Sequence, residues 1–194
     1  MNDIMQLMLT KRTYRRFDNS KKISDELIND IITSARLASS ACNLQPLRYI
    51  VVKSPELVKE VFGYTRWAAA LPDGKGTPKP ENEPVLFVIV TYDEKDKTKW
   101  VDTDAGLAMG NMTTVAWANG IGNCMLDNVD RDGLKACLGL SDSTVIQTVV
   151  GFGYPVHNSS IVELPETGKT GYWIDDAENW YVPKRSIDEI AEIR

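Results

Sequence analysis

Residues 85–90 read Val-Leu-Phe-Val-Ile-Val, an apolar run that follows Pro84 and ends before a charged turn at residues 93–99. An apolar run of this length between turn signals predicts a β-strand buried on both faces. It is far shorter than the ~20 apolar residues of a membrane-spanning helix. We therefore expect the fold to be built around a central strand at this position.

Helical and strand patterns alternate on both sides of this strand. Helices are predicted at residues 3–10, from Ser24 to near Ser39, from Ser54 to near Gly63, at residues 102–119, from Asp130 to Gly139, and after Ser186. Strands are predicted at residues 49–52, 124–126 and 144–152, and a hairpin at residues 172–174 and 180–182. Ser24, Asp130 and Ser186 can cap their helices. The helix at residues 102–119 is apolar on most sides, and its small residues would allow another helix, including one from a second subunit, to approach closely.

The length of 194 residues predicts a single domain. Prolines and glycines crowd residues 72–84, which predicts a surface loop within a flap at residues 68–84. Residues 172–194 are expected to form a C-terminal extension of the same domain.

The composition is that of an ordinary globular protein, with 43% hydrophobic and 25% charged residues. The net charge of −5 argues against nucleic acid or an anionic membrane as the main partner. Three cysteines without C-x-x-C spacing and a single histidine argue against a zinc site and a disulfide framework. The N-terminus lacks the charge order of a signal peptide. These features together predict a cytoplasmic protein with reduced thiols.

A basic cluster stands out against this acidic average. Residues 11–17 read Lys-Arg-Thr-Tyr-Arg-Arg-Phe. Guanidinium groups bind phosphate oxygens in a two-pronged way, so Arg12, Thr13 and Arg15 could converge on one phosphate. The alternative is a solvated basic patch that pairs with some of the acidic residues.

Two further segments carry polar groups in turns. Residues 39–46 read Ser-Ser-Ala-Cys-Asn-Leu-Gln-Pro. Such a loop could hydrogen-bond the edge of a heteroaromatic ring, or it could be a turn stabilised by its own serine and asparagine side chains. Residues 119–126 contain Gly120 and Gly122 but lack the G-x-G-x-x-G spacing and precede a strand, so a Rossmann site is not supported.

Taken in order, these segments resemble the nitroreductase family of FMN-dependent oxidoreductases. Residues 11–15 match the family's Arg-Arg-Ser-x-Arg motif, and residues 39–46 match its Pro-Ser-Ser-x-Asn-x-Gln-Pro motif. The helix from Asp104, the Gly-Ile-Gly-Asn-Cys of residues 120–124, the Gly-Tyr-Pro of residues 153–155 and a late basic pair follow in family order. Thr13 stands in place of the usual serine, Ser39 in place of proline, and Leu47 where an aromatic often follows.

The resemblance implies an α+β homodimer of nitroreductase-like fold, with a central mixed or antiparallel sheet flanked by helices and FMN at the subunit interface. The implied FMN phosphate and ribityl ligands are Lys11, Arg12, Thr13 and Arg15, completed by Lys184 and Arg185. From the other subunit, the implied contacts are Ser39, Ser40, Ala41, Asn43 and Gln45. Backbone at Met125, Leu126 and Asp127 would face the ring and donate to N5. No residue is assigned a catalytic role, because the flavin carries the chemistry.

The implied reaction moves electrons from NADH or NADPH through flavin N5 to a nitroaromatic, a quinone or a related small acceptor, in a ping-pong cycle. Alternatives are a specialised reaction on the same cofactor, such as dehalogenation, flavin fragmentation or dehydrogenation, and a non-enzymatic flavin-binding module. We expect His157 to be an exposed loop histidine, Cys42 a small packed residue and Trp67 core filler, although Trp67 could instead stack on a flavin.

Overall fold

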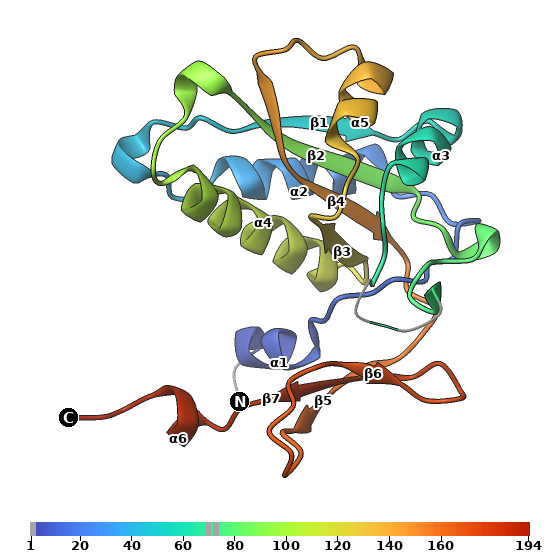
Figure 1. The fold of residues 1–194 in the computed structure, drawn as a ribbon, viewed down its shortest axis with the longest axis vertical. Helices are drawn as coiled ribbons and strands as arrows, with labels where there is room; N and C mark the ends of the chain where they lie inside the picture. The colour runs from blue at the N-terminus through green and yellow to red at the C-terminus, as the bar shows by residue number, and fades with distance from the viewer. Residues whose placement is uncertain (1–2, 69–70, 72–73) are drawn as a thin grey trace.

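The computed structural model describes residues 3–68, 71 and 74–194 and contains two β-sheets. The larger sheet is antiparallel throughout, in the order β1-β2-β4-β3. Its strands are β1 (Arg48–Val52), β2 (Leu86–Asp93), β3 (Gly122–Leu126) and β4 (Thr144–Gly153). All residues of β2 except Asp93 are buried, which confirms the predicted central strand (Figure 1).

The two faces of β2 pack into two separate clusters of apolar side chains. Leu86, Val88 and Val90 lie in a cluster with α2 (Asp25–Arg36) and α4 (Val101–Ala118). Phe87 and Ile89 lie in a second cluster on the opposite face. Two further helices cover that face, α3 (Pro55–Gly63) and α5 (Arg131–Leu138) (Figure 1). Because side chains alternate along a strand, a continuous apolar run is needed to bury both faces.

Local capping explains where several helices begin and end. The Ser24 side chain accepts a hydrogen bond from the Leu27 amide, as predicted. Asp130 caps α5, and Gly139 ends it with a φ of 61°, a conformation that suits glycine. The helix predicted to reach Ser39 already ends at Arg36, where α2 gives way to the turn before the polar loop.

The smaller sheet is formed by the C-terminal part of the chain, in the order β5-β7-β6. Its strands are β5 (Ser159–Glu163), β6 (Trp173–Ile174) and β7 (Trp180–Lys184). The predicted hairpin is present as β6 and β7, whereas β5 was not predicted and pairs with β7 in parallel. The smaller sheet lies on the same side of the main body as α1 (Asp3–Thr10) (Figure 1).

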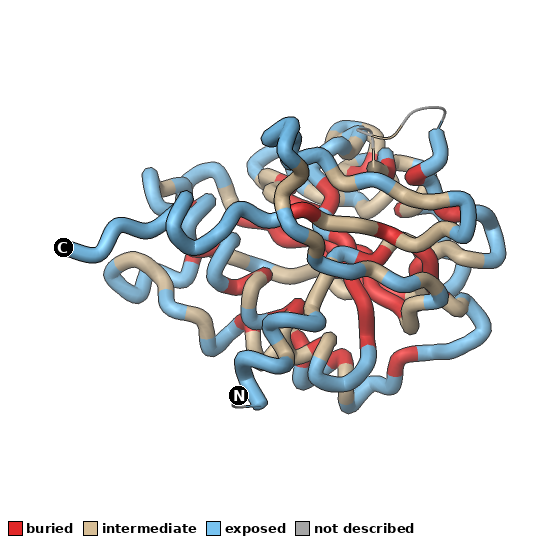
Figure 2. The backbone as a smooth tube through the Cα atoms, turned by 90° about the horizontal axis from the view of Figure 1, so that it is seen from below, coloured by how far each residue is buried: buried red, intermediate tan, exposed pale blue. Residues whose placement is uncertain are grey.

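The C-terminal end of the chain is exposed. The capping box predicted at Ser186 is present and starts the short helix α6 (Ile187–Ile190). Figure 2 shows the buried backbone concentrated in the centre of the molecule, with α6 and the residues after it exposed. Of the predicted flap at residues 68–84, residues 69–70 and 72–73 lie outside the described residues. Its later part contains a short 3₁₀ turn, Pro80–Asn82.

Candidate functional site

The basic segment, residues 11–16, lies against strand β3. Thr13 bridges to Asn123, and the Tyr14 amide donates to the Asn123 carbonyl at 2.8 Å. The Tyr14 ring is buried and stacks on Trp117 of α4, with centroids 5.0 Å apart. A Cβ on Gly122 would lie 2.9 Å from that of Tyr14, so glycine permits this close approach. The fold therefore brings two of the predicted site segments side by side.

The first two cations of the segment are held by neighbouring helices. The Lys11 amine donates to the hydroxyls of Thr113 at 3.1 Å and Thr114 at 2.9 Å, both on α4. Burial lowers the pKa of Lys11, and the charge of Arg12 lowers it further. The Arg12 guanidinium donates to the carbonyls of Lys11 and Leu9 at the end of α1.

The next two arginines contact the smaller sheet. The Arg15 guanidinium carbon lies 4.7 Å from the ring centroids of both Tyr172 and Trp180, within range of a cation–π interaction. Arg16 is only 5% exposed, and its Nε donates to Glu178 at 2.8 Å while its Nη2 donates to the Lys75 carbonyl at 2.7 Å. Arg16 was not among the predicted ligands, and no local pattern reveals a partner 162 residues away.

The basic segment contains buried guanidinium nitrogens that lack acceptors. Arg12 Nε, Arg15 Nε and Arg16 Nη1 are buried and have no hydrogen-bond partner among the residues described. A buried donor on a charged group is costly when it is left unsatisfied. A phosphate offers the charge and the oxygen acceptors that would satisfy such donors. The segment thus fits the phosphate end of FMN. The alternative of a patch paired with acidic residues holds for Arg16, which pairs with Glu178, but among the described residues it does not hold for Arg12 and Arg15.

The polar loop at residues 39–46 is anchored to α4 by a buried carboxylate. Asp104 is 4% exposed and accepts from the Ser40 hydroxyl at 2.7 Å and from the Ala41 amide at 3.0 Å. The Ser40 oxygen in turn accepts from the Gln45 amide at 3.0 Å. The loop therefore does carry the internal serine bond of the self-stabilised turn, but Asp104, which we did not predict as a partner, holds it in place.

The backbone of this loop is strained. Cys42, Asn43 and Gln45 have φ values of 51°, 54° and 50°, in the left-handed region that non-glycine residues rarely occupy. Three such residues within four positions cost on the order of 1–3 kcal/mol each. Strain of this kind persists only where the surrounding structure imposes it, and it gathers at functional sites.

The polar loop and the basic segment contact α4 at different positions along its axis. Asp104 holds the loop near the start of α4, whereas Thr113 and Thr114 hold Lys11 near its end. Thr113 lies nine positions after Asp104, which corresponds to about 14 Å along the helix axis. The fold of one chain therefore keeps these two segments apart.

The remaining predicted contacts are distributed along two strand ends. Met125 is 44% exposed, Leu126 is buried, and Asp127 is exposed just beyond β3. Lys184 ends β7 and is exposed. Arg185 is exposed as well and pairs with Glu189 of α6 at 3.3 Å.

The prediction of an exposed histidine is wrong. The chain after β4 folds back along the basic segment, where the Val156 amide donates to the Arg16 carbonyl at 3.1 Å. This places the His157 ring against Tyr14 and Trp180, with centroid distances of 5.2 and 5.5 Å. Both ring nitrogens are buried and lack a hydrogen-bond partner of good geometry within the described ranges. Burial lowers the pKa of His157 to about 4.

The expectations for Cys42 and Trp67 had opposite outcomes. Cys42 is exposed at the tip of the strained loop, so the prediction of a packed residue is wrong for the single chain. Trp67 is buried in the second apolar cluster, and its indole nitrogen donates to Thr65 at 2.8 Å. This confirms Trp67 as core filler.

No helix in the described part of the chain is long and apolar enough to cross a membrane.

Comparisons with known proteins all point to one protein family. The sequence matches the Nitroreductase family over residues 8–154. An Archaeoglobus fulgidus protein named "Putative NADH dehydrogenase/NAD(P)H nitroreductase" is 30% identical over 170 residues, covering 86% of this chain and 93% of its own length. A Staphylococcus epidermidis protein named "Putative NAD(P)H nitroreductase" is 26% identical, covering 93% of this chain and 99% of its own.

Solved structures share the fold. The crystal structure of a "putative nitroreductase in complex with fmn" from Desulfovibrio desulfuricans superimposes with a TM-score of 0.68 at 22% identity, covering 86% of this chain and 94% of that one. A Bacteroides fragilis nitroreductase with bound FMN gives a TM-score of 0.64 at 20% identity, covering 80% and 90%. The α+β fold and the family predicted from the motifs are both confirmed, and this chain belongs to the nitroreductase family.

Proposed function

We propose that this protein is an FMN-dependent oxidoreductase that takes electrons from NADH or NADPH and delivers them to a nitroaromatic, a quinone or a related small acceptor. The observation that carries the proposal is the set of buried, unpaired nitrogens on Arg12, Arg15 and Arg16. Family membership and the FMN complexes among its structural neighbours support the identity of the anion. When bound, FMN supplies the redox chemistry, and the protein binds and orients it.

The basic segment binds the phosphate and ribityl chain in this proposal. Arg12 and Arg15 each retain a free buried donor, and the exposed Thr13 adds a hydroxyl between them. Lys11 adds positive charge, with its amine held by the hydroxyls of Thr113 and Thr114 on α4. Stacking on Tyr172 and Trp180 restricts the rotation of Arg15, so less entropy is lost when it binds the anion. Lys184 and Arg185 complete the anion site.

The end of β3 orients the flavin ring in the same proposal. The basic segment and β3 are joined through Asn123, so a cofactor held by the former lies near the latter. Backbone at Met125, Leu126 and Asp127 faces the ring, with an amide donating to N5. Leu126 is the last residue of β3, and its buried side chain keeps the strand end in place.

We further propose that two copies of the chain form the working unit. The separation of about 14 Å along α4 keeps the polar loop of one chain away from its own basic segment. The exposed face of α4 carries Gly106 and Gly110, where an added Cβ would meet nothing within 4 Å, beside the exposed Leu107. This face allows a second α4 to approach closely. Ser39, Ser40, Ala41, Asn43 and Gln45 would then contact FMN bound by the partner copy.

Replacing Arg15 tests the site directly. A lost charge-assisted hydrogen bond costs about 1.5–3 kcal/mol. Arg15→Ala should therefore weaken FMN binding about 10- to 150-fold, measured by quenching of FMN fluorescence. Arg194→Ala, the same change at the exposed C-terminus, is the matched control and should bind FMN as the wild type does.

Two results would overturn the proposal. One is a purified protein that is colourless and does not bind added FMN. The other is an unchanged FMN affinity in Arg15→Ala. Turnover of NADH or NADPH with menadione, compared with a panel of specialised substrates, then separates a general reductase from a dedicated enzyme on the same cofactor.

A further inference from the structure

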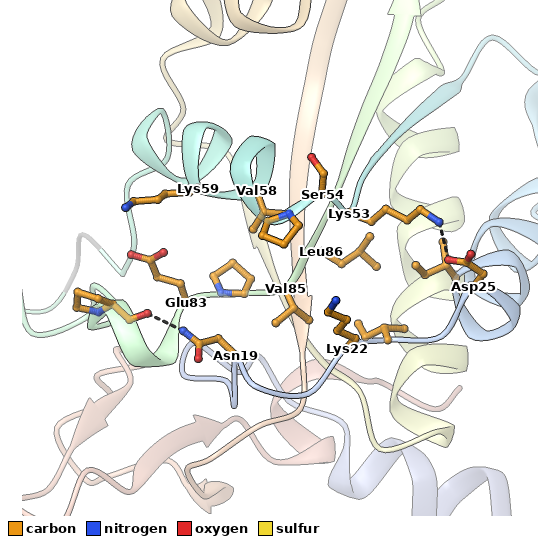
Figure 3. Close-up of a pocket in the computed structure, with 15 residues that line it drawn as sticks. Asn19, Lys22, Asp25, Lys53, Ser54, Val58, Lys59, Glu83, Val85 and Leu86 are labelled. Atoms are coloured by element: carbon orange, nitrogen blue, oxygen red, sulfur yellow. Dashed lines mark hydrogen bonds and ion pairs between the residues drawn. The ribbon is translucent and has the colours of Figure 1, made fainter.

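One cavity of the structure lies away from every predicted FMN contact. It has a volume of about 770 Å³ and opens where the starts of α2, α3 and β2 meet (Figure 3). Its walls come from residues 19–28, 53–59 and 80–86. None of these belongs to the basic segment, the polar loop, the end of β3 or the basic pair at Lys184 and Arg185. Its size falls within the usual range of small-molecule sites.

The inner wall of this cavity is apolar. Leu86 and Ile28 belong to one apolar cluster of the core, and Val58 belongs to the other. Val58 and Val85 lie around the middle of the cavity in Figure 3, and Pro84 lines the cavity as well. The cavity therefore opens between the two clusters, and a ligand there would contact hydrocarbon surface over most of its body.

The rim is charged, and most of its charges are balanced. Lys53 pairs with Asp25 at 2.6 Å at one side of the cavity (Figure 3). On the other side, burial raises the pKa of Glu83, and the positive charge of Lys59 opposes that rise. Lys22 remains, and it has no carboxylate within ion-pair distance in the described part of the chain. One uncompensated positive charge thus stands beside an apolar wall, in a protein of net charge −5.

We propose that this cavity binds a small carboxylate with an aliphatic or aromatic body, with the apolar body against Val58, Val85 and Leu86 and the carboxylate at Lys22. A free phosphate would leave the apolar wall unused, and a neutral apolar molecule would leave Lys22 unpaired. Burial of the body provides the main favourable term, and the ion pair sets the preference for an anion. The proposal does not depend on the function proposed for the FMN site.

The test is a calorimetric titration of the purified protein, with and without added FMN, with 3-phenylpropionate and with its neutral isostere 3-phenylpropanamide. We expect saturable binding of one carboxylate per chain and binding of the amide about two- to fivefold weaker, because Lys22 is exposed and an exposed ion pair is weak. Lys22→Glu should weaken carboxylate binding at least tenfold. Lys21→Glu, the same change at an adjacent exposed lysine that does not line the cavity, should leave it unchanged.

A second variant and a second measurement locate the ligand. Val85→Phe enlarges a side chain of the apolar wall. It should weaken the binding of both 3-phenylpropionate and 3-phenylpropanamide. Bound carboxylate should slow amide hydrogen exchange in residues 53–59 and 80–86 and leave the visible flavin spectrum unchanged. Absence of carboxylate binding, equal losses in the two lysine variants, equal binding of the amide, or a shifted flavin spectrum with no dependence on Lys22 would each overturn the proposal.

Discussion

Asp104 holds the strained polar loop, and replacing it should release that loop. The carboxylate is 4% exposed and accepts from the Ser40 hydroxyl at 2.7 Å and the Ala41 amide at 3.0 Å. A hydrogen bond to a charged group contributes about 1.5–3 kcal/mol. The two bonds share one acceptor and the freed donors can reach water, so we expect Asp104→Ala to lower the free energy of unfolding by about 2–4 kcal/mol. For a chain of this length, that corresponds to a fall in Tm of roughly 5–15 °C.

Two measurements check this expectation. Urea unfolding followed by circular dichroism measures the free energy of unfolding. Amide hydrogen exchange measures the loop itself, because the Ala41 amide loses its acceptor and the Gln45 amide depends on the placement of Ser40. Both amides should exchange at least tenfold faster in Asp104→Ala, which corresponds to about 1.4 kcal/mol of lost protection.

The control is Asp102→Ala, an exposed carboxylate in the first turn of the same helix. It tests only the interaction of an acidic side chain with the helix dipole, about 0.3–1 kcal/mol. If Asp104→Ala is within 0.5 kcal/mol of the wild type, or if Asp102→Ala costs as much, then the carboxylate does not anchor the loop. Asp104→Asn should be intermediate, because its amide keeps one oxygen acceptor.

Three further predictions follow from burial. The pKa of His157 is about 4 in the folded protein and near 6.5 in the unfolded chain, so the unfolded state takes up a proton first as the pH falls. The free energy of unfolding should therefore fall by on the order of 3 kcal/mol from pH 6.5 to 4. Urea unfolding of His157→Phe should show a flatter pH dependence, and parallel curves for the variant and the wild type would contradict the assignment. Cys124, buried with its pKa raised to about 11, should react with Ellman's reagent only on unfolding. Gly153→Ala would place a Cβ 2.7 Å from that of the fully buried Phe17 and should cost about 1–3 kcal/mol in thermal unfolding, so an unchanged Tm would be evidence against this packing.

Local features of the fold could be predicted from the sequence because they depend on neighbouring residues. The run at residues 85–90 became the buried centre of the sheet. Ser24 and Asp130 cap the helices expected of them, because a side-chain oxygen needs to reach an amide only a few residues away. β5 was missed because its two central apolar residues, Ile161 and Val162, gain a partner only when β7 returns beside them.

The candidate site shows the same difference between local features, which could be predicted, and long-range contacts, which could not. The order of the polar and basic motifs was enough to predict the family and to select the residues for an FMN site. Only the tertiary structure paired Arg16 with Glu178, anchored the polar loop to Asp104 and packed the His157 ring against Trp180. Each of these contacts joins residues more than 20 positions apart, and no local pattern encodes them. The sequence by itself therefore determined which chemical groups are available, whereas the packing of distant segments decided which of them are buried, strained or left without a partner.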